Sequence, residues 1–391
     1  MKSKITKLID TLSPDILYFA QQLIQTPSFT GQEGSLAKLV MSKMTELDYD
    51  HVSADALGNV IGIIGNGPTG ILFDSHMDTV GVNHPKAWRY DPFGGEIVDG
   101  KMYGRGSADM KSALAAAVFA GHTIKRLGLQ KDKTIYITAS VMEEDYDGET
   151  VYTLCRQLES LPDYAVICEP SGLDLALGHK GRALLKVTSK GVSAHGSAPE
   201  KGVNAVYKMS PLLKRVEALN NAMMQQGNET GSIALTKISS SSESLNAIPA
   251  QCEVYLDRRL VKGEDKATIS KEMDTLLDGT DASWEVYDKC GKSYTGVPVV
   301  LHSFLPSWEI SSNNVLTKAC IKIYKIIFER KPRLMKWDFC TNGVATAGRL
   351  NIPTIGFGPG DSKKAHTIDE YCEISQIAEA TGFYALLPVY L

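Results

Sequence analysis

The sequence of 391 residues contains no apolar run that approaches the roughly 20 residues needed to cross a bilayer. Its longest candidate, residues 113–121, is short and consists mainly of small side chains. The lysines near the N-terminus are not followed by an apolar segment of the kind that a secretory signal contains. These absences argue against a membrane partner and predict a cytoplasmic protein.

The seven cysteines are scattered along the chain, and no two of them form a Cys-x-x-Cys pair. An odd number of dispersed cysteines is typical of reduced, mostly buried thiols, which again favours the cytoplasm. The 41 basic residues are balanced by 45 acidic residues and form no basic block, so the net charge is −4. This balance argues against a nucleic-acid partner.

Two common catalytic signatures are missing as well. The chain has no Gly-x-Ser-x-Gly motif, which disfavours Ser-His-Asp chemistry. Gly104-Arg105-Gly106 lacks the third glycine of a dinucleotide-binding fingerprint. A hydrophobic content of 43% is ordinary for a globular protein, and the length predicts about two domains.

Strands alternate with helices in the first half of the chain. Helices are expected from Ser13-Pro14 to about residue 25, over residues 35–47, and from Asp109 to about residue 127. Buried strands are expected at residues 59–64, 71–74, 134–141 and 164–168. This alternation predicts an α/β fold whose sheet has helices on both faces.

The pattern changes between residues 181 and 292. Four strands and two helices, many of them patterned on one face, predict a compact α+β unit. After it the first pattern resumes, with a helix at residues 314–329, a strand at 353–357 and a closing helix at 374–387. The second domain is therefore predicted to be inserted into the first, which comprises residues 1–180 and 293–391.

Seven acidic and imidazole residues lie at or beyond the ends of the predicted strands. They are His76, Asp78, Asp109, Glu143, Glu144, Glu169 and His366. In α/β folds, ligands bind at the carboxyl ends of the strands, so these side chains are expected to converge. Imidazoles and carboxylates in this ratio suit two divalent metal ions, with Zn²⁺ favoured and Co²⁺ or Mn²⁺ as alternatives. Metal-assisted hydrolysis is the leading interpretation.

These motifs resemble a family of co-catalytic metallohydrolases that includes aminoacylase, acetylornithine deacetylase, succinyl-diaminopimelate desuccinylase and carboxypeptidase G. Within the family, Glu143-Glu144-Asp145, the segment Ser193–Glu200 and Phe339–Val344 look most similar to hydrolases of the YgeY type, which are linked to selenium metabolism. The resemblance implies a phosphorylase/hydrolase-like mixed sheet and a ferredoxin-like insert that acts as a lid and dimerisation domain.

The resemblance also implies a role for each residue of the cluster. His76 and Glu169 would hold one metal ion, Glu144 and His366 the other, and Asp109 would bridge the two. Asp78 would hydrogen-bond His76 and fix its tautomer. Glu143 would be the general base, a role typically worth about 10²- to 10⁴-fold in rate.

Further site residues are implied by the same resemblance. His195 would reach the active site of a partner subunit and stabilise the oxyanion, which implies a homodimer. Asn246 would contact the substrate. Arg259 would bind a substrate carboxylate, although Arg258 stays an alternative because neighbouring residues of a strand point to opposite faces.

The chain departs from the family before its late helix. Many relatives have a Gly-Gly-Thr or Gly-Gly-Ser loop there, whereas this chain has Cys340-Thr341-Asn342-Gly343. We expect Asn342 and Gly343 to contribute to substrate binding through the start of that helix.

The predicted activity is cleavage of an amide (C–N) bond in a small substrate that bears a carboxylate. An N-acyl amino acid deacylase is favoured over a dipeptidase or carboxypeptidase, because Glu169 occupies a position where the deacylase relatives have glutamate. A ureido-acid amidohydrolase on the same scaffold and a non-catalytic metal- or ligand-binding protein are the alternatives.

Overall fold

The computed structural model describes residues 1–227, 230–242 and 244–391, and it divides the chain into two compact units. The first unit comprises Met1–His179, Cys290–Val300 and Glu309–Leu391, and the second comprises Lys180–Lys289 and Leu301–Trp308. Among the described residues, no helix combines the length and the apolar composition that crossing a membrane requires.

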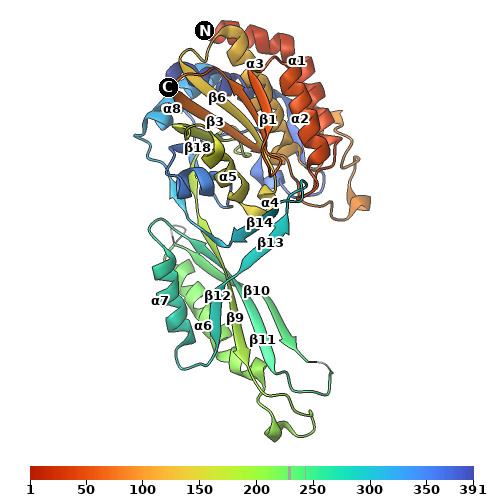
Figure 1. The fold of residues 1–391 in the computed structure, drawn as a ribbon, viewed down its shortest axis with the longest axis vertical. Coiled ribbons are helices and arrows are strands. Elements are labelled where there is room, and N and C mark those ends of the chain that lie inside the picture. The colour runs from red at the N-terminus through yellow and green to blue at the C-terminus, as the bar shows by residue number, and fades with distance from the viewer. Residues whose placement is uncertain (228–229, 243) are drawn as a thin grey trace. The chain divides into compact units, whose positions relative to one another are not determined.

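The first unit is built around a mixed sheet (Figure 1). Its strands follow the order β1 (His51–Ala54), β2 (Val60–Ile64), β6 (Lys133–Ser140), β3 (Thr69–His76), β7 (Tyr164–Ile167), β18 (Thr354–Gly356) and β8 (Leu175–His179), with β17 (Leu334–Trp337) paired to β8. The neighbouring strands β6, β3, β7 and β18 are parallel, whereas β1, β2 and β8 pair in antiparallel fashion with β2, β6 and β18.

Helices cover both faces of this sheet, as predicted. They are α1 (Lys2–Ile24), α2 (Gly34–Glu46), α3 (Ser112–Leu127), α4 (Glu143–Tyr146), α5 (Glu149–Gln157), α8 (Val315–Phe328) and α9 (Ile374–Tyr390). Helices α1, α3 and α9 pack against one another, α8 packs against α9, and α3 contacts β3 and β6. On the opposite face, α5 and the short helical turn Val344–Arg349 cover an apolar cluster formed with Leu72, Tyr136 and Ala165.

A small antiparallel sheet completes this unit. It contains β4 (Ile97–Val98), β5 (Lys101–Tyr103) and β19 (Tyr371–Glu373), with Tyr371 opposite Tyr103. The remaining helical turns in this unit are Pro85–Ala87, Ser107–Lys111 and Ser362–Lys364.

The second unit has the ferredoxin-like arrangement that the resemblance implied. The chain passes through β9 (Gly181–Lys190), α6 (Ala205–Gln225), β10 (Ser232–Ser241), β11 (Gln251–Leu260), α7 (Lys266–Leu277) and β12 (Ser283–Val286). The sheet order is β10-β11-β9-β12, so each helix connects strands that are not neighbours. Burial alternates along β9 and β11, and one face of the sheet forms an apolar core with α6 and α7.

Two predicted boundaries in the first unit are wrong. The first helix begins at Lys2 rather than at Ser13, and it contains Pro14. Buried Ile5, Ile9 and Ile16 continue one apolar face through the proline, so burial of that face outweighs the lost hydrogen bond. The helix expected to open at Asp109 begins at Ser112, because the turn Ser107–Lys111 precedes it.

The boundary of the insert also differs from the expected residues 181–292. Residues 290–300 belong to the first unit, and Leu301–Trp308 return to the second. The reason is β15 (Phe304–Leu305), which pairs with β9 through Phe304 and Ala183. The paired strands β13 (Asp288–Lys292) and β14 (Pro298–His302), and the short β16 (Trp308–Glu309), span the points where the chain changes unit.

Candidate metal centre

The parallel strands bring acidic and imidazole side chains to one edge of the sheet. His76 is the last residue of β3, and Glu169 follows β7. Glu143 opens α4 just after β6, and His366 lies in the loop after β18. Because β6, β3, β7 and β18 are parallel neighbours, their carboxyl ends meet at this edge.

Asp109 stands between two groups of these side chains. Its Oδ1 lies 3.0 Å from Nε2 of His76, and that nitrogen lies 3.6 Å from Oε1 of Glu169. Its Oδ2 lies 3.3 Å from Nε2 of His366, which is 3.0 Å from Oε2 of Glu144. The two oxygens of one carboxylate therefore face two different imidazoles, each with a second carboxylate beside it.

The two groups differ in their access to solvent. His76 and Glu169 are buried, whereas the His366 side chain is 49% exposed. The cluster is therefore open on the side of His366 and closed on the side of His76.

The donor atoms are close enough to hold metal ions. Ligand atoms of His76, Asp109 and Glu144 lie within 4.8 Å of one another, as do those of His76, Glu143 and Glu169. Oε1 of Glu143 is buried and has no hydrogen-bond partner among the residues that the structure describes. A buried cluster of carboxylates with so few donors to balance it suits bound cations, so the residues fit divalent ions. The second grouping also admits Glu143 as a ligand rather than a base.

Burial and neighbouring charges shift the pKa values of the buried side chains Glu143, Glu169 and His76. Burial raises the pKa of Glu143 well above its ordinary value, and the nearby Glu169 raises it further. The pKa of Glu169 is raised in the same way, by burial and by Asp109. Burial alone would lower the pKa of His76, but Glu169 and Asp109 outweigh it and raise that pKa well above its usual range.

On the exposed side, the hydrogen bonds of Asp109 and Glu144 raise the pKa of His366 to about 10. The pKa of Asp109 is lowered although burial opposes this, because both imidazoles hydrogen-bond its carboxylate. Protons on the two imidazoles therefore offset part of the negative charge of the carboxylates.

Asp78 holds this cluster by a route different from the expected one. The His76 ring nitrogen Nδ1 lies 2.9 Å from the main-chain oxygen of Asp78, and 3.6 Å from its carboxylate. The carboxylate instead accepts hydrogen bonds from the backbone amides of Glu143 (2.9 Å) and Glu144 (3.1 Å). Asp78 thus orients His76 through its carbonyl and holds the start of α4 through its side chain.

Glu33 was missed by the sequence analysis. Its Oε1 accepts hydrogen bonds from the amides of Gly31 (2.9 Å) and Met142 (3.1 Å), and its Oε2 is buried without a partner. Burial, reinforced by Asp78, raises the pKa of Glu33 to about 7. A glutamate between Gly31 and Gly34 reads as a surface turn, so the sequence carried no signal of this contact.

The substrate-binding assignment of Asn342 and Gly343 is not supported by their contacts. Asn342 is buried, and its Nδ2 donates to Asp74 (2.8 Å) and Ser140 (3.0 Å) while its Oδ1 accepts from the Gly148 amide (3.0 Å). The Gly343 amide donates to Oγ1 of Thr341. These groups are used inside the first unit, so they are not available to a ligand.

In the second unit, His195 and Asn246 lie side by side. His195 forms a β-bridge with Ala247, and the amide of Gly196 donates to the main-chain oxygen of Asn246 at 2.5 Å. The Ser197 amide donates to Nδ1 of the exposed His195 (3.1 Å), which leaves Nε2 as the N–H donor of a neutral ring.

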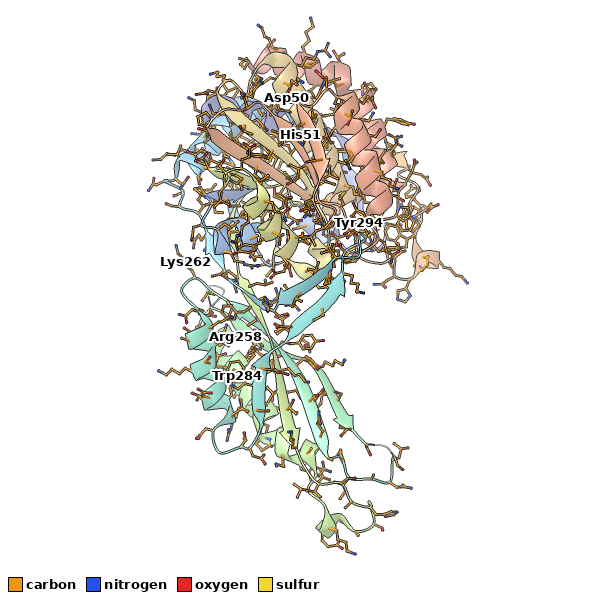
Figure 2. All side chains as sticks on the ribbon, viewed as in Figure 1. Asp50, His51, Arg258, Lys262, Trp284 and Tyr294 are labelled. Atoms are coloured by element: carbon orange, nitrogen blue, oxygen red, sulfur yellow. The ribbon has the colours of Figure 1, made fainter. Side chains whose placement is uncertain are left out.

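The two arginines of β11 face opposite sides of the sheet. Arg258 is 1% exposed and forms ion pairs with Glu264 and Glu272 on the helix side (Figure 2). Arg259 points to the other face, where it pairs with Asp257 at 2.8 Å and keeps 31% of its side chain exposed. Arg258 is therefore committed to internal pairs, and only Arg259 is accessible.

Comparison with known proteins shows that one sequence family matches most of the chain. A sequence model of peptidase family M20/M25/M40 matches residues 72–388. Protein YgeY of Escherichia coli K12 is 33% identical over 96% of this chain and 94% of its own length. Acetylornithine deacetylase of Photorhabdus laumondii is 26% identical, covering 93% of this chain and 94% of its own.

The fold is also similar to that of a solved structure. The YXEP protein of Bacillus subtilis, described as a dinuclear metal-binding peptidase of the M20 family, superimposes with a TM-score of 0.71. The match covers 97% of this chain and 98% of the other, at 13% sequence identity.

We expect Asn342→Ala to destabilise the protein rather than weaken substrate binding. The change leaves the Gly148 amide without its acceptor and removes one of the donors to the buried Asp74 carboxylate, which costs about 1–3 kcal/mol. Thermal unfolding would measure this loss, with exposed Asn313→Ala as the matched control. If the variant instead had an unchanged unfolding temperature and a raised KM, Asn342 would be a substrate-binding residue.

We expect the Glu33→Gln variant to lose less folding stability than the wild type as the pH rises. The folded-state pKa of about 7 lies above the ordinary value of 4.5, so the folded protein keeps a proton that the unfolded chain loses. As the pH rises from 4.5 to about 7, the free energy of unfolding of the wild type should decrease relative to that of the variant. The expected decrease is on the order of 1–3 kcal/mol. Urea unfolding at pH 5 and pH 8 would show it, and exposed Glu46→Gln should follow the wild type.

Proposed function

Because the chain belongs to peptidase family M20/M25/M40, whose members are metal-dependent hydrolases of amide bonds, we propose that it hydrolyses N-acyl amino acids at a dinuclear centre. The observation that carries this proposal is Asp109, whose two carboxylate oxygens face two separate groups of ligands. The alternative of a non-catalytic binding protein is set aside, because the chain is a hydrolase by family.

In this proposal His76 and Glu169 would hold one ion, Glu144 and His366 would hold the other, and Asp109 would offer one carboxylate oxygen to each group. The imidazole nitrogens and carboxylate oxygens suit Zn²⁺, with Co²⁺ or Mn²⁺ as alternatives. When bound, the two ions would supply Lewis acidity that activates water and polarises the scissile carbonyl.

Glu143 is proposed as the general base and later the general acid. Its buried Oε1 has no partner, so it can accept a proton from the attacking water and deliver it to the leaving amine. Burial raises the pKa of Glu143, and cations at the neighbouring ligands would act in the opposite direction. Burial therefore strengthens Glu143 as a proton acceptor, and bound cations would keep its carboxylate ionised.

Asp78 is proposed as the residue that keeps this geometry. Its carbonyl accepts from Nδ1 of His76, which leaves the unprotonated Nε2 free to act as a ligand. Its carboxylate holds the amides of Glu143 and Glu144, so the base and one ligand are fixed by the same group.

The second unit is proposed to bind the substrate and to form a homodimer. Nε2–H of His195 is a suitable donor for the oxyanion of a partner's substrate, with Asn246 beside it. Arg182 and Arg259 share the single carboxylate of Asp257, so positive charge is in excess at this point of the sheet. Arg259 would use that charge to bind the carboxylate of the substrate.

Dipeptide hydrolysis is the second candidate. The similarity to acetylornithine deacetylase extends over nearly the whole chain and favours deacylation, as does the glutamate at position 169. The fold is shared with a peptidase, which favours dipeptides. Both reactions cleave an amide bond beside a carboxylate, so only the leaving and retained groups distinguish them.

We expect Glu143→Ala to reduce turnover by more than about 10²-fold because the proton acceptor is lost, while metal content stays near that of the wild type. Amine release from N-acyl amino acids, dipeptides and ureido acids would be followed with metal-reconstituted protein. Elemental analysis of the same samples would count bound ions. Loss of an ion in this variant would make Glu143 a ligand, and full activity would remove it from the mechanism.

Mixing two inactive variants would test the contribution of His195. We expect Glu143→Ala and His195→Ala protomers to recover part of the activity when mixed, because a mixed dimer would contain one site with both residues intact. Subunit exchange would be confirmed with differently tagged protomers. If exchange occurs without any recovery, the site is completed within a single chain.

A further inference from the structure

Glu370 is a buried carboxylate that lies shortly after His366 and outside the set of ligands. Its side chain is fully buried. Oε1 accepts hydrogen bonds from the amides of Ala108 (2.9 Å) and Asp109 (3.1 Å). Its main-chain oxygen accepts from the Gly104 amide (2.9 Å). Glu370 therefore holds the segment that carries Asp109 at both of its ends.

The other carboxylate oxygen of Glu370 is held by Arg105. The Arg105 Nη1 lies 2.5 Å from Oε2, and the guanidinium lies over the ring of Trp88 at 5.3 Å. Arg105 is only 2% exposed. Transferring two charges from water to the protein interior costs free energy. A protein with apolar residues of similar volume in place of a buried ion pair is often equally stable. Stability alone therefore does not explain why this ion pair is buried. The contacts of Glu370 with the amides of Ala108 and Asp109 indicate that the pair orients Asp109.

The backbone at Asp109 explains why this contact matters. Asp109 has φ −127° and ψ 93°, which is not helical. Its amide is bonded to the Glu370 side chain rather than to a preceding turn of helix. The position of its carboxylate between His76 and His366 thus depends on an acceptor from a distant part of the chain.

The same contact ties Asp109 to the loop that carries His366. Tyr371, next to Glu370, pairs with Tyr103 in the small sheet of β5 and β19. The segments 101–109 and 366–373 consequently form one assembly, in which the bridging ligand and a terminal ligand are fixed together.

We propose that Glu370, with Arg105 as its counter-charge, is the positioning residue of the metal centre: by accepting the amides of Ala108 and Asp109 it fixes Asp109 relative to His366 and sets the affinity for the ion that these two residues share. This inference rests on the proposed dinuclear function. Glu370 does not touch the ions or the substrate in this role and acts only through Asp109 and His366.

A pair of double variants separates this role from simple loss of charge. Glu370→Gln with Arg105→Met removes both charges and keeps an oxygen that can accept from the two amides. Glu370→Leu with Arg105→Met removes both charges and the acceptor. Exposed Glu373→Gln, in the same segment, serves as the control. Each metal-free full chain would be titrated with Zn²⁺ by calorimetry, and its thermal unfolding would be followed by circular dichroism.

We expect the leucine variant to lose about 10- to 100-fold in affinity for at least one ion, as is typical when a partner of a ligand is removed. The glutamine variant and the control should bind close to the wild type. Equal, wild-type affinity in both double variants would overturn the inference while leaving the proposed function intact. A wild type that binds no Zn²⁺ would overturn the proposed function and this inference with it.

Should the leucine variant not fold without metal, Glu370→Asp would take its place. This change keeps the charge but shortens the side chain by one methylene, so the carboxylate no longer reaches both Arg105 and the amides. A similar loss of Zn²⁺ affinity in a folded Glu370→Asp chain supports the positioning role, and unchanged affinity contradicts it.

Discussion

The structure of the first unit depends on concentrating negative charge where water is scarce. Five carboxylates share the edge of the sheet with two imidazoles: Asp78, Asp109, Glu143, Glu144 and Glu169 beside His76 and His366. Burying charged groups is expensive unless hydrogen bonds or opposite charges compensate them. The parallel strands bring these groups to one edge, and hydrogen bonds from backbone amides to Asp78 and Glu370 hold the main chain beside them.

One contact recurs around the cluster: a carboxylate outside the proposed set of ligands accepts the backbone amide of a residue that belongs to, or lies next to, the proposed ligands and base. Asp78 accepts the amides of Glu143 and Glu144, Glu370 accepts that of Asp109, and Glu33 accepts that of Met142. Each acceptor fixes the main chain and leaves the ligand side chain free for metal or substrate. Met142 adopts a positive φ of 61°, and such an uncommon conformation persists where surrounding contacts determine it.

The sequence predicted what short-range patterns encode. Apolar runs followed by His76, Glu143 and Glu169 placed these residues at strand ends, and alternation identified the inserted unit. Contacts between distant segments were not predictable. Arg105 and Glu370 are separated by 265 residues, and nothing local marks either as buried. The hydrogen bonds of Asn342 were not predictable for the same reason, since its partners Asp74 and Ser140 come from strands far away in the chain.

In the second unit, neighbouring residues of strand β11 point to opposite faces of the sheet and have different partners. Arg258 and Arg259 are neighbours on β11, yet the first is paired within the core by Glu264 and Glu272, whereas the second shares the opposite face with Asp257. Removing Arg258 would leave two partly buried acids, Glu264 and Glu272, without their guanidinium partner, which is costly. Removing Arg259 disturbs no apolar contact of that core. The face that carries Arg259 can therefore change its charge and shape without disturbing the apolar core of the unit that supports it.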